Sequence, residues 1–139
     1  MGSDQAEFLS RQRNGLGRYV NQSEIAKRPD MAAALQQIAG LSVRRGSGGL
    51  VVDNRRYGCA PLVVVDGVPL AGGGGSSTIP GADAARSMSP AEIRLDALNP
   101  RDVFAIEYYA GAAGMPLRYS IGDAPRCGML LVWTVFSRW

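Results

Sequence analysis

Short apolar runs, separated by glycine and polar residues, dominate the hydrophobic pattern of this chain. Three of these runs, Leu62–Val65, Val103–Tyr109 and 129–133, are rich in β-branched or aromatic residues and are shorter than most helices. Runs of this kind without strict polar alternation are typical of strands that are buried on both faces of a sheet. We therefore expect the three segments to form the centre of one sheet.

Further strands are predicted where apolar runs flank turn residues. Residues 41–45 and 50–53 are joined by a glycine-rich segment, which indicates a hairpin. Asp66 and Gly67 lie between Leu62–Val65 and a short apolar segment, and this dipeptide favours a tight turn between antiparallel strands. The sequence therefore predicts strands on either side of the central three.

Two helical segments precede the first hairpin. Ser23 can cap a single helical turn over 23–27, which Pro29 would end. Asp30 can cap a longer helix over 31–38, where apolar residues recur at the spacing of one helical face. We expect that face to pack against the sheet.

A third helix is predicted over 91–98. Ser89 and Glu92 have the spacing of a capping box, and Pro90 occupies the first helical position. The connections before this helix and after Tyr109 are long and rich in glycine, proline and small residues. The predicted fold class is α+β, with a small mixed β-sheet of four to five strands, two or three short helices and long loops.

The length and composition suit one globular domain. The chain has 139 residues, of which 46% are hydrophobic, and this is enough to bury a core. We expect residues 1–20 to form a polar N-terminal arm with a short strand near its end. Residues 21–134 then form the domain, and residues 135–139 form a C-terminal tail.

The charge pattern does not point to nucleic acid. The formal net charge is +3, and the basic residues are spread along the chain rather than gathered with aromatic residues in a known binding module. No apolar stretch reaches the roughly 18 residues that a membrane helix needs. We expect neither a nucleic-acid partner nor a direct membrane span.

The residue types needed for common catalytic and metal sites are missing. The chain has no histidine, which removes the usual general base and a frequent zinc ligand. Glu92 fits a helix cap, Asp66 a turn and Asp102 a junction between helix and strand, so no pair of carboxylates is set up for catalysis. We expect no enzymatic activity, no metal site and no cofactor.

The two cysteines occupy corresponding places in the pattern. Cys59 and Cys127 each precede one of the predicted central strands, and strands of one sheet could bring them together. Three interpretations remain at this point: a structural disulfide, two buried thiols and a redox-active pair. Their separation does not fit a metal site. A disulfide would indicate a compartment outside a reducing cytosol.

The ordered set of these motifs resembles the plug domain of TonB-dependent outer-membrane receptors, in particular plugs with two cysteines that flank the sheet. The resemblance covers roughly residues 8–134. It rests on an apolar strand that ends in Asp-Gly, a strand with the pattern Ile-Glu-x-Tyr, a closing Cys-Gly-apolar-Trp-Thr strand and an upstream Ile, Pro, Leu and Gly-Leu-Ser-Val series. The residues are Ile25, Pro29, Leu35, Gly40, Cys59, Pro61, Asp66, Gly67, Ile106, Glu107, Cys127, Gly128, Trp133 and Thr134.

The resemblance implies a role in the uptake of a scarce nutrient, such as a siderophore, cobalamin or a saccharide, across an outer membrane. It implies a location in the periplasm or outer membrane, an outer-membrane β-barrel as partner, and TonB as a possible further partner. It also favours a disulfide between Cys59 and Cys127. In such plugs, loops at one end of the sheet contact the ligand; the corresponding candidates here are Arg55, Arg56, Tyr57, Gly72, Gly73, Gly74, Gly75, Ser76 and Ser77.

Glu107 lies inside a predicted strand and needs a partner if its face of the sheet is covered; the alternative is exposure at a sheet edge. Glutamate is common at this place in the plugs, where the barrel wall can supply an arginine. Within this chain Arg94 and Arg101 are the candidates for a structural ion pair with Glu107.

The length leaves two functional hypotheses. A 22-stranded barrel needs about 220 residues before any loop is counted, so this chain does not transport anything by itself. It is either a plug whose barrel lies elsewhere or a stand-alone periplasmic binding or signalling module that reuses the plug fold.

Overall fold

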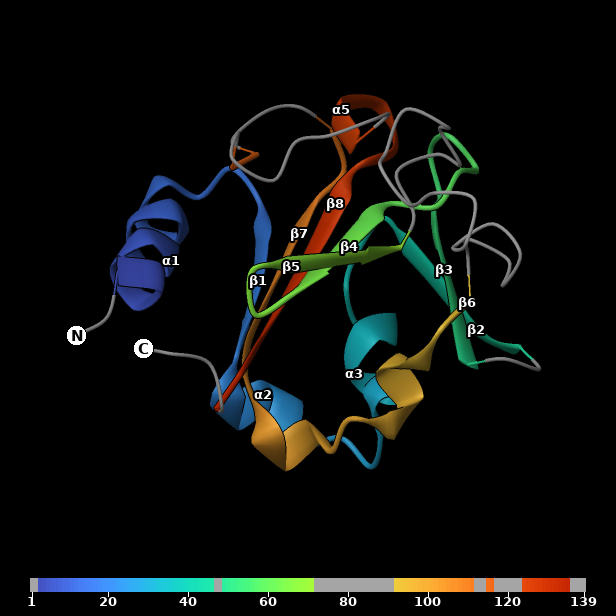
Figure 1. Cartoon of the computed structure of the whole chain (residues 1–139), viewed down its shortest axis with the longest axis horizontal. Coiled ribbons are helices and arrows are strands. Elements are labelled where there is room, and N and C mark those ends of the chain that lie inside the picture. Colours follow the sequence, from blue (N-terminus) through green and yellow to red (C-terminus); the bar gives the residue numbers. More distant parts are fainter. Residues whose placement is uncertain (1–2, 47–48, 72–91, 112–114, 117–123, 136–139) are drawn as a thin grey trace.

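The structure is a computed structural model that describes residues 3–46, 49–71, 92–111, 115–116 and 124–135. Its centre is a five-stranded sheet in the order β1-β7-β8-β4-β5 (Figure 1). The strands are β1 (Arg18–Asn21), β4 (Leu62–Val65), β5 (Val68–Ala71), β7 (Val103–Tyr109) and β8 (Met129–Thr134). All neighbours are antiparallel except β4 and β8, which are parallel. The three central strands are therefore those that the hydrophobic pattern predicted.

A smaller sheet packs beside this one. It consists of β2 (Leu41–Gly46), β3 (Gly49–Asn54) and the two-residue strand β6 (Glu92–Ile93), in the order β2-β3-β6. β2 and β3 form the expected antiparallel hairpin, with Leu41 opposite Asn54. With the helices described below, this arrangement confirms the predicted α+β class.

Two short helices precede the hairpin, close to their predicted places. α2 (Gln22–Ala26) is capped by Asn21, whose side chain accepts a hydrogen bond from the amide of Glu24. The predicted cap, Ser23, instead lies inside the helix and donates to the Asn21 side chain. Asn21 takes the cap because it is the last extended residue of β1 and its side chain reaches the third amide beyond it.

The longer of the two, α3 (Met31–Gln36), is capped by Asp30 as expected. The Asp30 carboxylate accepts from the amide of Ala33 at 2.9 Å and from Arg45 at 2.6 Å. These contacts, the first above all, lower the pKa of Asp30 because they stabilise its ionised form.

The segment 91–98 is not the α-helix that the capping box predicted. Its described part forms the short strand β6 and then a 3₁₀-helix, η1 (Arg94–Ala97), while Ser89 and Pro90 lie outside the described residues. β6 pairs with β3 through Leu50 opposite Ile93. Pairing with the open edge of β3 gives the backbone N–H and C=O groups of β6 hydrogen-bond partners, which an α-helix would have supplied from within the segment. A second 3₁₀-helix, η2 (Pro100–Asp102), leads into β7.

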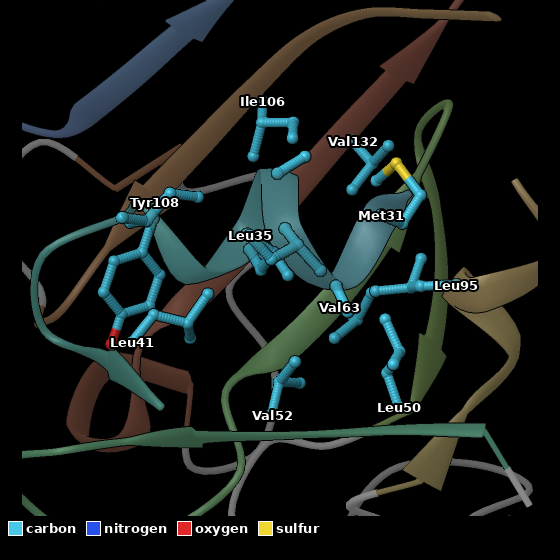
Figure 2. Packing of buried hydrophobic residues seen from close by; sticks show 14 of the residues in the cluster. Met31, Leu35, Leu41, Leu50, Val52, Val63, Leu95, Ile106, Tyr108 and Val132 are labelled. Atoms are coloured by element: carbon cyan, nitrogen blue, oxygen red, sulfur yellow. The ribbon is translucent and has the colours of Figure 1, made fainter. Parts of the chain in front are cut away.

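The first apolar cluster lies between the central sheet, the β2–β3 hairpin and α3 (Figure 2). It takes side chains from every neighbouring element, including Met31, Leu35, Leu50, Val63 and Ile106, and none of these is exposed. α3 thus packs its apolar face on the sheet, as its periodicity indicated.

The second apolar cluster covers the opposite face of the central sheet. Neighbouring residues of a strand point to opposite faces, so Val63 belongs to the first cluster and Val64 to the second. An N-terminal helix, α1 (Ser3–Asn14), lies beside β1 and closes this face (Figure 1). Its Phe8 is buried and packs edge-on against Tyr19 and Phe104. The expected short strand near residue 20 is present, but no sequence signal had predicted α1.

Among the described residues, no helix is long and apolar enough to cross a membrane.

Candidate functional site

A disulfide joins two strands at one end of the central sheet. Cys59 and Cys127 are bonded, with their Cα atoms 5.6 Å apart. The parallel register of β4 and β8 places Leu62 beside Met129, so the two cysteines, a few residues upstream, arrive at the same end of the sheet. The predicted disulfide is confirmed, and with it the position of both cysteines before paired strands.

The crossover into β8 is tightly packed at this end. Gly128 has φ of +91°, and a Cβ atom there would lie 2.5 Å from the carbonyl oxygen of Tyr109. Only glycine fits this backbone and this contact. The close approach brings the ends of β7 and β8 together beside the disulfide.

Asn54, the last residue of β3, connects this end of the sheet with the loop that follows. Its side chain is completely buried, and its Nδ2 donates to the carbonyl oxygens of Ala110 and Cys127 at 2.8 and 3.1 Å. Its Oδ1 accepts from the amides of Arg56 and Tyr57 at 2.9 and 3.4 Å. The asparagine side chain thus shapes the loop as an Asx turn.

A cleft of about 480 Å³ opens between this loop and the N-terminal segment that leads into β1. Its lining residues are 15–18 before β1, Arg56 and Tyr57 of the loop, and Tyr108, Ala110 and Gly111 at the end of β7. Residues far apart in the sequence therefore form one concave surface at the disulfide end of the sheet.

The charges of the cleft are of one sign. Arg18 and Arg56 are exposed and line it, and no acidic residue is among its lining residues. The guanidinium of Arg56 lies 5.2 Å from the ring centroid of Tyr57, a cation–π arrangement, and Tyr57 remains 48% exposed. Such a surface suits an anionic ligand with a flat group that can lie against an aromatic ring or a guanidinium plane.

Tyr108 also lines the cleft, although its side chain is buried in the first apolar cluster. Its hydroxyl donates to the carbonyl oxygen of Gly40 at 3.3 Å. Burial raises the pKa of Tyr108 to about 12, because the phenolate would lose its hydration. The side chain therefore stays protonated at neutral pH, and it adds no negative charge to the basic cleft.

A second polar site lies within the sheet, on the face that α1 covers. Glu107 is completely buried, and its carboxylate accepts four hydrogen bonds of 2.6–2.8 Å. Arg11 of α1 donates two of them from Nε and Nη2; the hydroxyl of Tyr109 and the indole of Trp133 donate the others. A buried charge with a full set of donors and a bidentate partner is a structural ion pair.

The contacts with Glu107 change the pKa values of Arg11 and Tyr109. Burial by itself would lower the pKa of Arg11, but the hydrogen bonds and negative charge of Glu107 outweigh burial and raise it. The pKa of Tyr109 is raised, first by burial and then by the neighbouring Glu107 charge. Arg11 therefore stays charged and Tyr109 stays neutral, so the network holds one fixed cation and one fixed hydroxyl donor.

Of the two predicted partners of Glu107, Arg101 was wrong and Arg94 is untested. Arg101 is exposed and precedes β7 by two residues, roughly 20 Å along the chain from Glu107. The side chain of Arg94 lies outside the described residues, so this candidate stays a prediction. The ion pair that the structure shows is with Arg11, in the segment that was expected to form a polar N-terminal arm.

The predicted ligand loops are only partly brought to the cleft. Arg56 and Tyr57 line it, whereas Arg55 is exposed and is not among the lining residues. The glycine-rich candidates, residues 72–77, lie outside the described residues.

Sequence reasoning missed Arg18, Asn54 and residues 15–17. An asparagine directly before Arg-Arg-Tyr-Gly is a signal for an Asx turn and could have marked Asn54. No local signal could have brought Arg18 to that loop, since the contact depends on how β1 pairs with β7.

A second basic concavity, of about 430 Å³, lies between α2 and η2. It is lined by Lys27, Arg28 and Arg101 among others. Lys27 pairs with Glu24, and Arg28 donates to Gln37, so local partners already engage two of these cations. Within the described ranges, no group of three or more His, Cys, Asp or Glu side chains could hold a metal ion.

Solved structures share this fold. The ferric enterobactin receptor PfeA of Pseudomonas aeruginosa, in complex with enterobactin, matches with a TM-score of 0.55 and 20% identity over 86% of this chain. The siderophore receptor PirA of Acinetobacter baumannii gives 0.54 and 18% over 86%, and the RagAB peptide importer gives 0.52 and 22% over 85%. The fold is plug-like. No protein-family model and no curated protein matches the chain.

The matched region is a small part of each of these proteins. The chain covers 17% of the PfeA chain, 17% of the PirA chain and 12% of the RagAB chain. The likeness thus concerns one domain of much longer receptors and importers.

Proposed function

We propose that this chain is a plug-like domain that works with an outer-membrane β-barrel in the uptake of a scarce nutrient, such as a siderophore, cobalamin or a saccharide. The observation that carries the proposal is the fold: most of the chain superposes on a small part of siderophore receptors and of a peptide importer. The barrel is supplied by a further part of the protein or by a separate chain, and TonB is a further partner. The domain acts in the periplasm or outer membrane, where the Cys59–Cys127 disulfide is stable.

The cleft at the disulfide end is the ligand-contacting surface in this proposal. Arg18 and Arg56 provide positive charge, and Tyr57 provides an exposed ring. The cleft is open on one side, so a ligand held there would still contact other groups, and the barrel is the source of those groups. Binding by the isolated chain is then weak, because part of the contacts is missing.

A specific observation favours a second candidate, a stand-alone periplasmic binding or signalling module. The chain supplies its own partner for the buried carboxylate of Glu107, and α1 covers the face of the sheet on which Glu107 lies. A plug that relied on a barrel for this counter-charge would not need Arg11. The two candidates differ in whether a barrel contacts the domain.

Photo-cross-linking in the native envelope distinguishes the two. A photoreactive residue at Val68, which is 57% exposed on the edge strand β5, reports what lies against the sheet edge. We expect a cross-link to an outer-membrane barrel protein, recognised by mass spectrometry and by heat-modifiable migration. The matched control carries the same group in a Val64→Asp background, in which the sheet does not form. Cross-links to soluble periplasmic proteins alone would overturn the uptake proposal in favour of the stand-alone module.

A further inference from the structure

Every backbone amide from Asn54 to Gly58 has a hydrogen-bond acceptor within the chain. The amide of Asn54 donates to Cys59 and that of Arg55 to Gly40; Gly58 returns a bond to the carbonyl of Asn54. The two amides between them, of Arg56 and Tyr57, donate to the Asn54 side chain. The backbone of five consecutive residues is therefore held by hydrogen bonds, although three of them carry large exposed side chains.

Asn54 is the residue that makes this possible. It bonds to the carbonyl oxygens of both disulfide-linked cysteines, through its own amide to Cys59 and through Nδ2 to Cys127. It also holds Ala110, which lies in the cleft wall. One buried side chain thus connects the disulfide, the end of β7 and the loop of Arg56 and Tyr57.

Few residue types could replace asparagine at position 54. The site requires two donors aimed at carbonyls and one acceptor aimed at amides, which is the hydrogen-bonding capacity of a carboxamide. Aspartate would place a charge in a fully buried position and lose both donors. The amide end of Asn54 lies close to Gly128, where a Cβ atom would be only 3.3 Å from Nδ2 of Asn54.

We propose that Asn54 is the positioning residue of the cleft, which holds Arg56 and Tyr57 in the orientation that receives an anionic ligand. The inference rests on the proposed function only for the identity of the cleft as a ligand site. A loop that is fixed before binding loses less conformational entropy when the ligand arrives, so its affinity is higher than that of a mobile loop. Asn54 acts through its two neighbours and has no contact with the ligand.

Amide hydrogen exchange tests the positioning directly. In Asn54→Ala the exchange of the Arg56 and Tyr57 amides should become at least tenfold faster, since both lose their acceptor. Asn54→Ser should restore part of the protection, because a hydroxyl also accepts from a following amide, though more weakly. The matched control is Asn99→Ala, which removes a similar bond in another part of the fold, donated by the amide of Arg101 to the side-chain oxygen of Asn99.

Binding of two probes tests the consequence. Benzoate and inorganic phosphate are titrated into each variant and followed by the amide shifts of Arg18, Arg56 and Tyr57, well below the melting temperature. We expect at least tenfold weaker binding in Asn54→Ala, partial recovery in Asn54→Ser and no change in Asn99→Ala. A folded Asn54→Ala protein with wild-type protection at Arg56 and Tyr57, or with wild-type affinity, would overturn the inference.

The failure of the proposed function gives a different result. If the wild-type chain shows no shifts with either probe, the cleft is not an anion site, and the exchange data still decide whether Asn54 positions the loop. If Asn54→Ala does not fold, Asn54→Ser decides the same question, with an intermediate loss of protection expected at Arg56 and Tyr57 alone. Faster exchange throughout the sheet in that variant would assign Asn54 a general structural role and contradict the positioning role.

Discussion

Adjacent residues of β7 show how the two faces of the sheet differ in chemistry. Glu107 is a buried carboxyl group that accepts four hydrogen bonds on the face covered by α1. Tyr108 points to the other face, where apolar side chains surround it and its hydroxyl reaches Gly40. The first residue stabilises the fold only while it is paired, and the second only while it is neutral.

Tyr108 gives the protein a predictable alkaline limit. Burial raises the pKa of Tyr108 from 10.0 to about 12 in the folded state. Below pH 10 the phenol is protonated in both states and its contribution is fully present; between pH 10 and 12 only the unfolded state releases the proton. The free energy of unfolding should therefore fall by about 2 kcal/mol over this window, with Tyr109 adding to the loss in the same direction.

Urea unfolding at several pH values between 9 and 12 measures this effect. Tyr108→Phe should show a smaller decrease across the window than the wild type, whereas the matched variant of an exposed tyrosine, Tyr57→Phe, should follow the wild type. Identical pH profiles for wild type and Tyr108→Phe would show that burial of Tyr108 does not control alkaline stability.

At the scale of elements, α1 is the clearest case of a helix fixed by tertiary contacts. Among its described residues, three side chains attach it to the central sheet: Phe8, which is buried, Leu9, which packs against the second cluster, and Arg11, which pairs with Glu107. Most of its other described residues are polar and at least partly exposed. A helix of this composition has little stability of its own, so its position depends on those contacts.

Removal of the Arg11 side chain should be costly. Arg11→Ala leaves the Glu107 carboxylate buried without its counter-charge, which typically lowers the free energy of unfolding by about 3–5 kcal/mol. Arg13→Ala, on the exposed side of the same helix, should change it by less than about 0.5 kcal/mol. Chemical denaturation of the two variants gives the comparison. Equal stabilities would mean that Glu107 does not depend on α1 for its charge balance.

At the scale of the whole molecule, the central sheet carries an apolar cluster on each face and a disulfide at one end. The strands β4 and β8 contribute to both clusters, so a single charge in either strand affects the entire domain. The solved structures that share this fold belong to chains several times longer, of which the matched region is a small part.

Core disruption should therefore prevent folding. Val64→Asp, like Leu131→Asp, places an unpaired charge among fully buried side chains, at a cost of several kcal/mol in a domain of marginal stability. Val68→Asp is the matched control, because Val68 lies just after the Asp66-Gly67 turn that follows β4 and is 57% exposed. Circular dichroism and thermal melting of the soluble fraction distinguish the outcomes. A soluble Val64→Asp protein that melts cooperatively would contradict the assignment of β4 to the core.

The sequence by itself determined the elements whose signals are local. Continuous apolar runs and turn residues predicted β4, β7, β8 and the β2–β3 hairpin, and the helical spacing of apolar residues predicted α3. The disulfide could also be predicted from the sequence, because both cysteines precede strands and the resemblance favoured their pairing. These features depend on backbone geometry and on burial, which neighbouring residues report directly.

Only the tertiary structure decided the contacts between distant segments. The partner of Glu107 is Arg11, 96 positions away, and the cleft combines Arg18 with Arg56 and Tyr57. The segment 91–98 became β6 and η1 because β3 offered an edge, against its own helical signal. In each case the contact is stabilised by a group from another element of the fold. A buried charge or an open strand edge pairs with the segment that the tertiary structure places next to it.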